Sequence, residues 1–318
     1  MLYYIARRFF LMVVILFLVS IMVFALINVI PGDPAVLMLG QEATPEALAA
    51  LRQNLGLNDP LFIQYLHWVG GVLQGNLGYS LADHTPVTDI LLSKIPVTVE
   101  LTILAFVLAI VIAVPVGIIS AVHKGTVWDY LTTVFALSGV SIPAFWLGIL
   151  LIYLLSVTLG WLPPSGYVPF SDNPARNLVL MIMPSIALGI RLSAQLTRML
   201  RSSLLEVMQA DYIRTGFAKG LLERAVVFQH ALRNAMLPVL TVAGLELSSF
   251  LGGAVITETI FAVPGLGQLI VNAILTRDFP VVQGAILFMA FAVVFVNFIV
   301  DIAYSLLDPR ISLGGASK

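Results

Sequence analysis

Few side chains in this chain could take part in chemistry, and one group of them is spaced along a single helical face. Of 318 residues, 59% are hydrophobic and only 10% are charged. Glu246, Ser249, Gly253 and Thr257 recur at the three- and four-residue spacing that places side chains on one face of an α-helix. Because a carboxylate within an apolar helix is costly to bury, we expect this face to point into a helix bundle or a watery cavity.

This face has two interpretations. It lines a path for a polar solute, or Glu246 is neutralised by a partner such as Arg191 while the small residues allow close helix packing. A second polar pair, Asn297 and Asp301, shares a face of the last apolar segment and is expected to hold helices together. The candidate path or bundle-interior residues are Arg191, Glu246, Ser249, Gly253, Thr257, Asn297 and Asp301.

The motifs of several enzyme classes are absent from the sequence. No G-x-x-x-x-G-K-[ST] loop is present to bind a nucleotide phosphate, and neither a G-x-S-x-G elbow nor an H-E-x-x-H pair occurs. The chain has no cysteine and its four histidines are scattered, so no metal site is expected. No basic cluster with interleaved aromatic residues indicates a nucleic acid partner. We therefore expect neither an enzyme nor a cofactor site, and any energy for transport must come from another chain.

The longest charged stretch begins at Asp211 and lacks an apolar run that could span a bilayer. Asp211 is expected to cap a short helix over 212–219, because its carboxylate can accept the free amides of the first turn. Gly220 suits the left-handed position just beyond that helix. A second helix is expected to end near Asn234, before a span that has Pro238 in its first turn. This helical hairpin predicts a docking surface for a soluble partner.

Six apolar segments are long enough to cross a bilayer as helices, which predicts an all-α polytopic membrane protein. The first segment has no small-residue cleavage site and is expected to remain uncleaved. Pro115, Pro143 and Pro184 lie inside spans and should kink them. The predicted spans are 9–30, 97–120, 130–156, 177–196, 237–258 and 282–306.

Composition divides the chain into three parts. These are the tail and first helix (1–30), a mixed polar insertion (31–95) and a five-helix membrane domain (96–318), which includes the charged loop 197–235.

Short helices are expected outside the spans. In the insertion, Thr44 and Asp59 each begin one, and Gly56 and Gly75 end them. The second of these has an apolar, aromatic face, which predicts that it lies on the membrane surface or packs on the bundle. A further short helix is expected over 266–275.

Basic residues set the expected orientation. Lys and Arg are concentrated in the N-terminal tail, the loop 197–235 and the C-terminal end. The positive-inside rule then places both termini and this loop in the cytoplasm, with 31–95 and 261–280 outside. Glu100 and Glu258, near the outer ends of their spans, are expected to reach water.

Several multi-residue motifs occur in order along nearly the whole chain. Together they resemble the membrane subunits of ABC importers of the dipeptide/oligopeptide/nickel permease family. The motifs are Arg7-Arg8, Pro31-Gly32-Asp33-Pro34, Leu55-Gly56-Leu57-Asn58-Asp59-Pro60, Gly75-Asn76-Leu77-Gly78, Arg201-Ser202-Ser203-Leu204-Leu205-Glu206-Val207, Asp211-Tyr212-Ile213-Arg214-Thr215, Ala218-Lys219-Gly220-Leu221, His230-Ala231-Leu232-Arg233-Asn234-Ala235-Met236-Leu237-Pro238, Thr257-Glu258-Thr259-Ile260-Phe261, Pro264-Gly265-Leu266-Gly267 and Asp308-Pro309-Arg310.

This resemblance implies a type I-like importer fold, in which a short cytoplasmic coupling helix sits in a groove of an ATP-binding subunit. Arg214 stands where a Glu is typical of importers in general, which narrows the resemblance to the peptide/nickel branch. Gly216 stands where Ala is usual in that branch and would loosen the helix by about 1 kcal/mol. The residues that the resemblance assigns to coupling are Asp211, Tyr212, Ile213, Arg214, Thr215, Ala218, Lys219, Gly220 and Leu221.

The resemblance also implies the partners. A second, similar permease subunit would complete the pore as a heterodimer in the lipid bilayer of a bacterial-type cell membrane. Two ATPase subunits would bind ATP and Mg²⁺, and an external solute-binding protein would deliver the solute. Short peptides are the favoured substrate because no histidine or thiol cluster marks a metal path, with nickel chelates and glutathione as alternatives. An ion-coupled secondary transporter and a membrane scaffold are the alternative classes, and the scarcity of paired carboxylates disfavours the former.

Overall fold

The computed structural model describes residues 2–29, 35–36, 44–54 and 56–307. Within these ranges the chain is helical and contains no β-strand. It packs as two units, each described here by itself. Unit 1 combines the chain before residue 99 with the chain after residue 263, and unit 2 is the chain between them.

Among the described residues, five helices are long and apolar enough to cross a membrane, and a bent helix pair would make a sixth. They correspond to predicted spans one, two, four, five and six. Their ranges are Ile5–Ala25 within α1 (Leu2–Val29), Val87–Val122 (α5), Pro174–Val207 (α8), Glu223–Phe261 (α10, η3 and α11) and Phe279–Ile302 within α13 (Phe279–Leu307).

The predicted third span is the bent pair. α6 (Val127–Ser141) meets the helix formed by α7 (Ala144–Leu151) and η2 (Ile152–Thr158) at 108°. Pro143 lies at the break, so the kink predicted there is confirmed. The bends predicted at the two other prolines stay predictions, because α5 and α8 run through them as unbroken helices.

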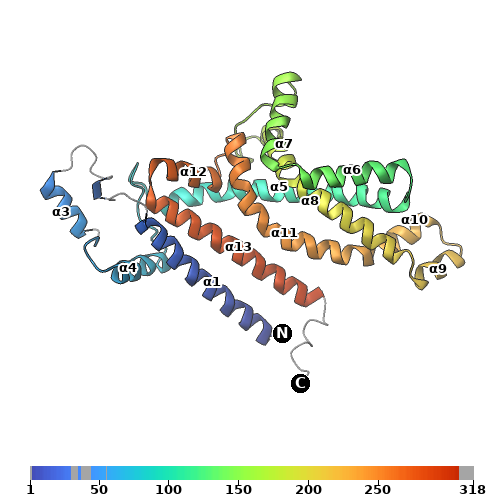
Figure 1. Cartoon of the computed structure of the whole chain (residues 1–318), viewed down its shortest axis with the longest axis horizontal. Coiled ribbons are helices and arrows are strands. Elements are labelled where there is room, and N and C mark those ends of the chain that lie inside the picture. The colour runs from blue at the N-terminus through green and yellow to red at the C-terminus, as the bar shows by residue number, and fades with distance from the viewer. Residues whose placement is uncertain (1, 30–34, 37–43, 55, 308–318) are drawn as a thin grey trace. The chain divides into compact units, whose positions relative to one another are not determined.

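Unit 1 is built on α1 and α13, which run side by side (Figure 1). The rings of Phe9 and Phe298 meet edge to face across this contact, with centroids 6.3 Å apart. α12 (Leu266–Thr276) packs on α13 and confirms the short helix expected over 266–275. The buried core side chains of this region are Val87, Leu91, Leu266, Ala273, Val281, Val282 and Ala285.

The two short helices predicted in the insertion are present as α3 (Pro45–Asn54) and α4 (Leu61–Leu73). The Thr44 hydroxyl accepts an amide of the first turn of α3 at 3.2 Å, as expected of a helix start. Gly56 and Gly75 follow the helices with φ of +65° and +81°, the left-handed conformation that favours glycine.

α4 packs on α1 through its aromatic face. The hydroxyls of Tyr65 and Ser20 are hydrogen-bonded at 2.8 Å, and the Phe24 ring lies 5.5 Å from the ring of Tyr65 and 5.9 Å from that of Trp68. Of the two places predicted for this helix, the structure shows packing against a membrane helix.

α8 is the central helix of unit 2, with α6, α7 and α11 (Leu232–Phe261) packed around it. Of its apolar stretch, 61% is buried, compared with 28% for that of α5. Small residues allow the neighbouring helices to approach closely. A Cβ added to Gly189 of α8 would lie 2.5 Å from the carbonyl oxygen of Ala105 in α5, and one added to Gly139 of α6 would lie 2.7 Å from the Cβ of Ala194.

Candidate functional site

α9 (Asp211–Ala218) is the short helix predicted in the charged stretch, but its start differs from the prediction. Asp211 is the first residue of the helix and makes no capping hydrogen bond. The amides that its carboxylate was expected to accept, those of Ile213 and Arg214, donate instead to the carbonyl of Ala210 at 3.0 and 3.3 Å. The capping role predicted for Asp211 is therefore wrong. A carboxylate in the first turn still stabilises the helix through its favourable interaction with the helix dipole.

The other end of α9 is as predicted. Gly220 has φ of +76°, and its amide donates to the carbonyl of Phe217 at 2.9 Å. The next amide, of Leu221, donates back to the carbonyl of Gly216 at 3.3 Å. This pair of bonds is a Schellman motif, which ends the helix sharply and satisfies its last carbonyls.

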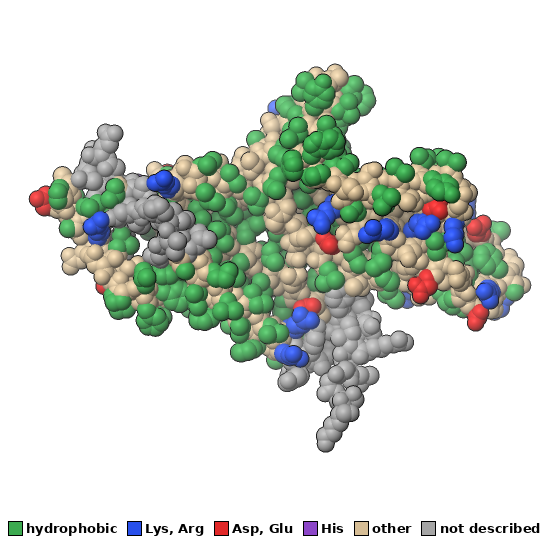
Figure 2. All heavy atoms as spheres, viewed as in Figure 1, with side chains coloured by type: hydrophobic (Ala, Val, Ile, Leu, Met, Phe, Trp, Pro, Cys, Tyr) green, Lys and Arg blue, Asp and Glu red, His purple; other side chains and the backbone are tan. Residues whose placement is uncertain are grey.

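α9 is anchored on one side and open on the other. Ile213 is buried, and α9 packs on the π-helical segment η3 (Val226–Ala231). The side-chain amide of Asn234 donates to the Tyr212 hydroxyl at 2.8 Å. Arg214 is largely exposed, and charged side chains gather at the end of unit 2 that carries α9 and α10 (Figure 2). The candidate coupling residues therefore lie together on α9 and its C-terminal turn, and all of them except the buried Ile213 are exposed to solvent.

The helix after α9 does not end near Asn234. α10 (Glu223–Ala225), η3 and α11 follow one another without a break, so Pro238 lies inside a helix and not in the first turn of a new one. The prediction of two helices here is wrong. Proline in a helix interior removes one backbone hydrogen bond and its ring crowds the carbonyl four residues earlier, but the packing of α11 on α8 and η3 holds the helix together here.

The polar face of α11 lies against α8. Glu246 accepts a hydrogen bond from the side-chain amide of Gln195 at 3.3 Å and another from the Ser249 hydroxyl at 3.0 Å. Arg191, the partner predicted for Glu246, is exposed and forms no ion pair with it in the described part of the chain. A Cβ on Gly253 would lie 3.1 Å from a methyl of Leu188 in α8. The carboxylate is thus matched by neutral donors, and the small residues serve helix contact, while a path role for this face stays a prediction.

The remaining candidate residues are separated from this face. Thr257 is buried one turn further along α11. Asn297 and Asp301 belong to unit 1, where Asp301 Oδ2 lies 2.6 Å from Arg8 Nη1 and joins α13 to α1. Asn297 lies one turn earlier on α13 and is half-buried.

Of the two glutamates that were expected to reach water, one is buried and the other is only partly exposed. Glu258 is fully buried. Glu100 accepts the Tyr167 hydroxyl at 2.8 Å through Oε2, while its Oε1 is buried without a partner among the described residues. Burial, together with the adjacent Glu100 carboxylate, raises the pKa of Tyr167 to about 12. Hydropathy placed both residues near span ends, but packing of the loop before α8 covers Glu100.

An ion pair in unit 2 between the buried Asp129 and the partly exposed Arg201 was not predicted from the sequence. Arg201 Nε and Nη2 donate to the two carboxylate oxygens of Asp129 at 2.7 and 2.9 Å. Ser120 Oγ and the Gly125 amide donate to the same carboxylate at 2.6 and 2.9 Å. Arg201 opens one of the densest motifs, but its partner is 72 positions away, and no local pattern joins the two.

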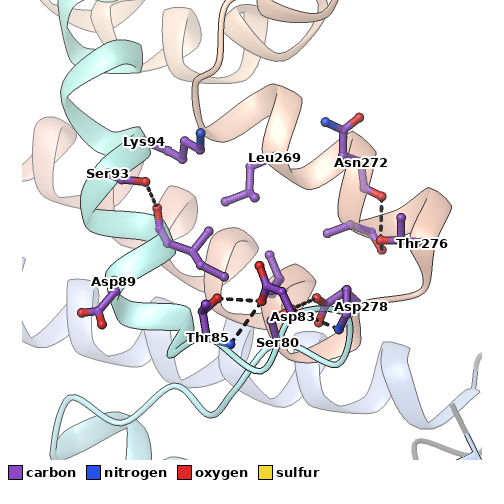
Figure 3. Close-up of a pocket in the computed structure, with 14 residues that line it drawn as sticks. Ser80, Asp83, Thr85, Asp89, Ser93, Lys94, Leu269, Asn272, Thr276 and Asp278 are labelled. Carbon is purple, nitrogen blue, oxygen red and sulfur yellow. Dashed lines mark hydrogen bonds between the residues drawn. The ribbon is translucent and has the colours of Figure 1, made fainter. Parts of the chain in front are cut away.

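The chain before α5 and helix α12, both predicted to lie outside, line a cavity of about 520 Å³ in unit 1 (Figure 3). The Ser80 hydroxyl and the Leu81 amide donate to Asp278 at 2.5 and 3.1 Å, which ties these segments together. Asp83 lies at the rim, where hydrogen bonds from the hydroxyl and amide of Thr85 lower its pKa. The cavity therefore combines polar and charged groups, among them Asp83, Asp89 and Lys94, with an apolar lining from residues such as Ile90 and Leu269.

Comparison with known proteins identifies the family of the chain. The family model "Binding-protein-dependent transport system inner membrane component" matches residues 113–313, and the model of the N-terminal membrane component of the same systems matches residues 1–102. A putative peptide transport system permease protein of Brucella suis is 44% identical over 297 residues, which cover 93% of this chain and 95% of that protein.

Two further relatives cover nearly the whole chain. The di/tripeptide transport system permease protein DppB of Pseudomonas aeruginosa is 43% identical, and the dipeptide transport system permease protein DppB of Escherichia coli is 41% identical. Each alignment covers 98% of this chain and 99% of the relative. The chain therefore belongs to the family of inner membrane components of binding-protein-dependent ABC transport systems, and it is a multi-pass protein of the bacterial inner membrane.

Proposed function

We propose that this chain is one membrane subunit of an ATP-driven importer that carries short peptides into the cytoplasm. The observation that carries the proposal is the geometry of α9, a short helix anchored by Ile213 and closed by a Schellman motif at Gly220. Its free side carries exposed aromatic and basic groups. The names of relatives aligned over 98% of the chain, which refer to dipeptide and di/tripeptide transport, support the solute class.

In this proposal α9 is the contact to the ATPase. Both termini and α9 lie in the cytoplasm, as the distribution of basic residues indicates. An ATPase groove would take up Tyr212 and Phe217, which are each more than 40% exposed, and would pair acidic side chains with Arg214 and Lys219. ATP and Mg²⁺ bind to the ATPase subunits and not to this chain, which acts as a permease without catalytic residues of its own.

Movement of α9 would reach the membrane helices by two routes. Toward the N-terminus, residues 208–210 form a hydrogen-bonded turn that joins α9 to α8. Toward the C-terminus, η3 leads without a break into α11. α8 and α11 pack on each other along the face that holds Glu246. A movement of α9 would therefore displace both helices together.

The remaining partners complete the transporter. A second, homologous permease subunit forms the other half of the pore, and a second ATPase docks on its own coupling helix. An external solute-binding protein releases the peptide at the outer side, where the insertion and α12 form the cavity around Asp83 and Asp278. This arrangement alternates access to the path between the two sides of the membrane.

A charge reversal on α9 tests the proposal. The chain is purified with its permease partner and ATPases, and Arg214→Glu with Lys219→Glu is compared with Arg176→Glu, an exposed change at the opposite end of α8. In proteoliposomes with the binding protein and a labelled dipeptide, the α9 variant should lose uptake, whereas Arg176→Glu should keep it. Normal uptake by the α9 variant would refute the assigned contact, and loss of ATPase subunits from the purified variant would support it.

A further inference from the structure

We propose that Asp129 and Arg201 form a rigid clamp between the neighbouring ends of α5, α6 and α8, so that these ends move as one body when α9 moves. Arg201 is then a positioning residue for coupling. The inference rests on the proposed function, because it concerns how a push on α9 is transmitted. It adds a residue pair outside α9 to the coupling machinery.

The clamp joins three parts of unit 2 at one carboxylate. Arg201 lies on α8, Asp129 in the first turn of α6, and Ser120 near the end of α5. The amide of Gly125, in the turn between α5 and α6, adds a fourth donor. Two carboxylate oxygens therefore receive four hydrogen bonds of 2.6 to 2.9 Å from three segments of the chain.

The chemistry of the pair favours one fixed geometry. The guanidinium of Arg201 donates through Nε and Nη2 to both oxygens, and such a two-bond fork tolerates little rotation or sliding of the helices. Asp129 is 7% exposed and the Arg201 side chain is 31% exposed, so water and salt screen the carboxylate end of the pair only weakly. Packing beside the pair is also tight, because a Cβ on Gly117 of α5 would lie 3.0 Å from the Leu200 side chain of α8.

The clamp lies directly on one route from α9. Arg201 is less than two helical turns from Val207, the last residue of α8. Met208 and Ala210, which follow, donate to the carbonyls of Leu204 and Val207 at 2.9 and 3.0 Å, so the link to α9 is a hydrogen-bonded turn and not a loose loop. Arg201 is the one charged residue of α8 that is partly buried, so a displacement of α9 reaches it through the end of α8 and the clamp passes it to α5 and α6.

The test must separate transmission from folding. Asp129→Asn leaves the partly exposed Arg201 without its ion-pair partner, and Arg201→Gln leaves the buried Asp129 carboxylate without its cation, so each single variant is expected to lose stability. The double variant removes both charges and relieves that defect. Arg201→Lys keeps the charge but loses the fork, and Arg176→Gln at the far end of α8 serves as the control for removing an arginine.

Each variant is purified as the full transporter and reconstituted with its binding protein. Three quantities are measured for each variant. They are the amount of dipeptide taken up per ATP hydrolysed, the ATPase activity stimulated by the binding protein, and the melting temperature. We expect the double variant to melt close to the wild type but to take up about tenfold less peptide per ATP, a change usual for coupled sites. Arg201→Lys should be intermediate, and Arg176→Gln should match the wild type.

The opposite result is equally clear. If the double variant recovers both stability and peptide per ATP, the pair is structural only and the inference is wrong. Failure of the proposed function would look different, because the Arg214→Glu, Lys219→Glu variant would then transport normally whatever the clamp variants do.

Discussion

The Asp129–Arg201 pair and the Asp211–Arg214 pair lie in the same unit and use the same two residue types, but only the first has a buried carboxylate. Its oxygens and nitrogens meet at 2.7 and 2.9 Å with two further donors. In the second pair the closest approach is 3.7 Å, and the side chains are 97% and 74% exposed. Water keeps the second pair loose, so its charges are available to a partner, whereas the first holds helices in place.

The largest expected effect is loss of the buried carboxylate of the Asp129–Arg201 pair. Asp129→Asn leaves the Arg201 charge without its partner and should lower the stability of the purified transporter by about 3 kcal/mol. Asp211→Asn, the matched change in the exposed pair, should alter it by less than about 0.5 kcal/mol. Thermal unfolding in detergent measures both, and equal shifts would show that burial does not distinguish the pairs.

The next effect concerns backbone contact at the centre of unit 2. Gly189→Ala forces a Cβ to within 2.5 Å of the Ala105 carbonyl oxygen, and separating α8 from α5 should cost about 2 kcal/mol. Gly252→Ala is the control, because no atom lies within 4 Å of the added Cβ. Because alanine has the higher helix propensity, Gly252→Ala should leave stability unchanged or raise it by up to about 1 kcal/mol. Thermal unfolding in detergent again measures both variants. If Gly189→Ala left the stability of the transporter unchanged, α8 and α5 would be able to move apart at little cost.

A smaller effect of opposite sign is expected on α9. A Cβ on Gly216 would meet Val226 and Leu221 at 3.6 and 3.7 Å, which are ordinary contacts, so nothing in the structure requires glycine there. Gly216→Ala should stabilise α9 by about 1 kcal/mol through its higher helix propensity. Slower amide hydrogen exchange over residues 211–218 would show this. Faster exchange would mean that the methyl group disturbs the contact with η3.

The smallest effect at neutral pH is expected at Tyr167. Its pKa is raised to about 12, whereas tyrosine in an unfolded chain ionises near 10. The folded state therefore holds the proton more tightly, and this stabilisation is complete below about pH 10 and lost as the pH rises to about 12.

Tyr167→Phe should remove that dependence and change stability at pH 7 by only about 1 kcal/mol, because one hydrogen bond to Glu100 is lost. Ultraviolet titration of tyrosinate in the wild type and in Tyr167→Phe gives the pKa by difference. A difference signal centred near pH 10 would contradict the buried hydrogen bond.

Local signals in the sequence predicted several features correctly. Thr44, Gly56 and Gly220 each act through a cap or a left-handed turn that involves neighbours within a few residues. Five spans and the break at Pro143 follow from hydropathy and from the missing amide of proline, which also act locally. The wrong predictions at Asp211 and Pro238 are of another kind, because the same residues suit a cap, a first turn or a helix interior, and the neighbouring structure selects among them.

The sequence by itself determined the membrane class, the approximate spans, the short helix of the charged loop and, through its motifs, the family. These depend on apolar length, turn chemistry and contiguous residues. Only the tertiary structure decided which carboxylates meet which donors: Glu246 with Gln195, Asp301 with Arg8 and Asp129 with Arg201. The physical reason is that a charge is stabilised by whatever donor packing brings within about 3 Å, and in a helical bundle that donor comes from a distant part of the chain.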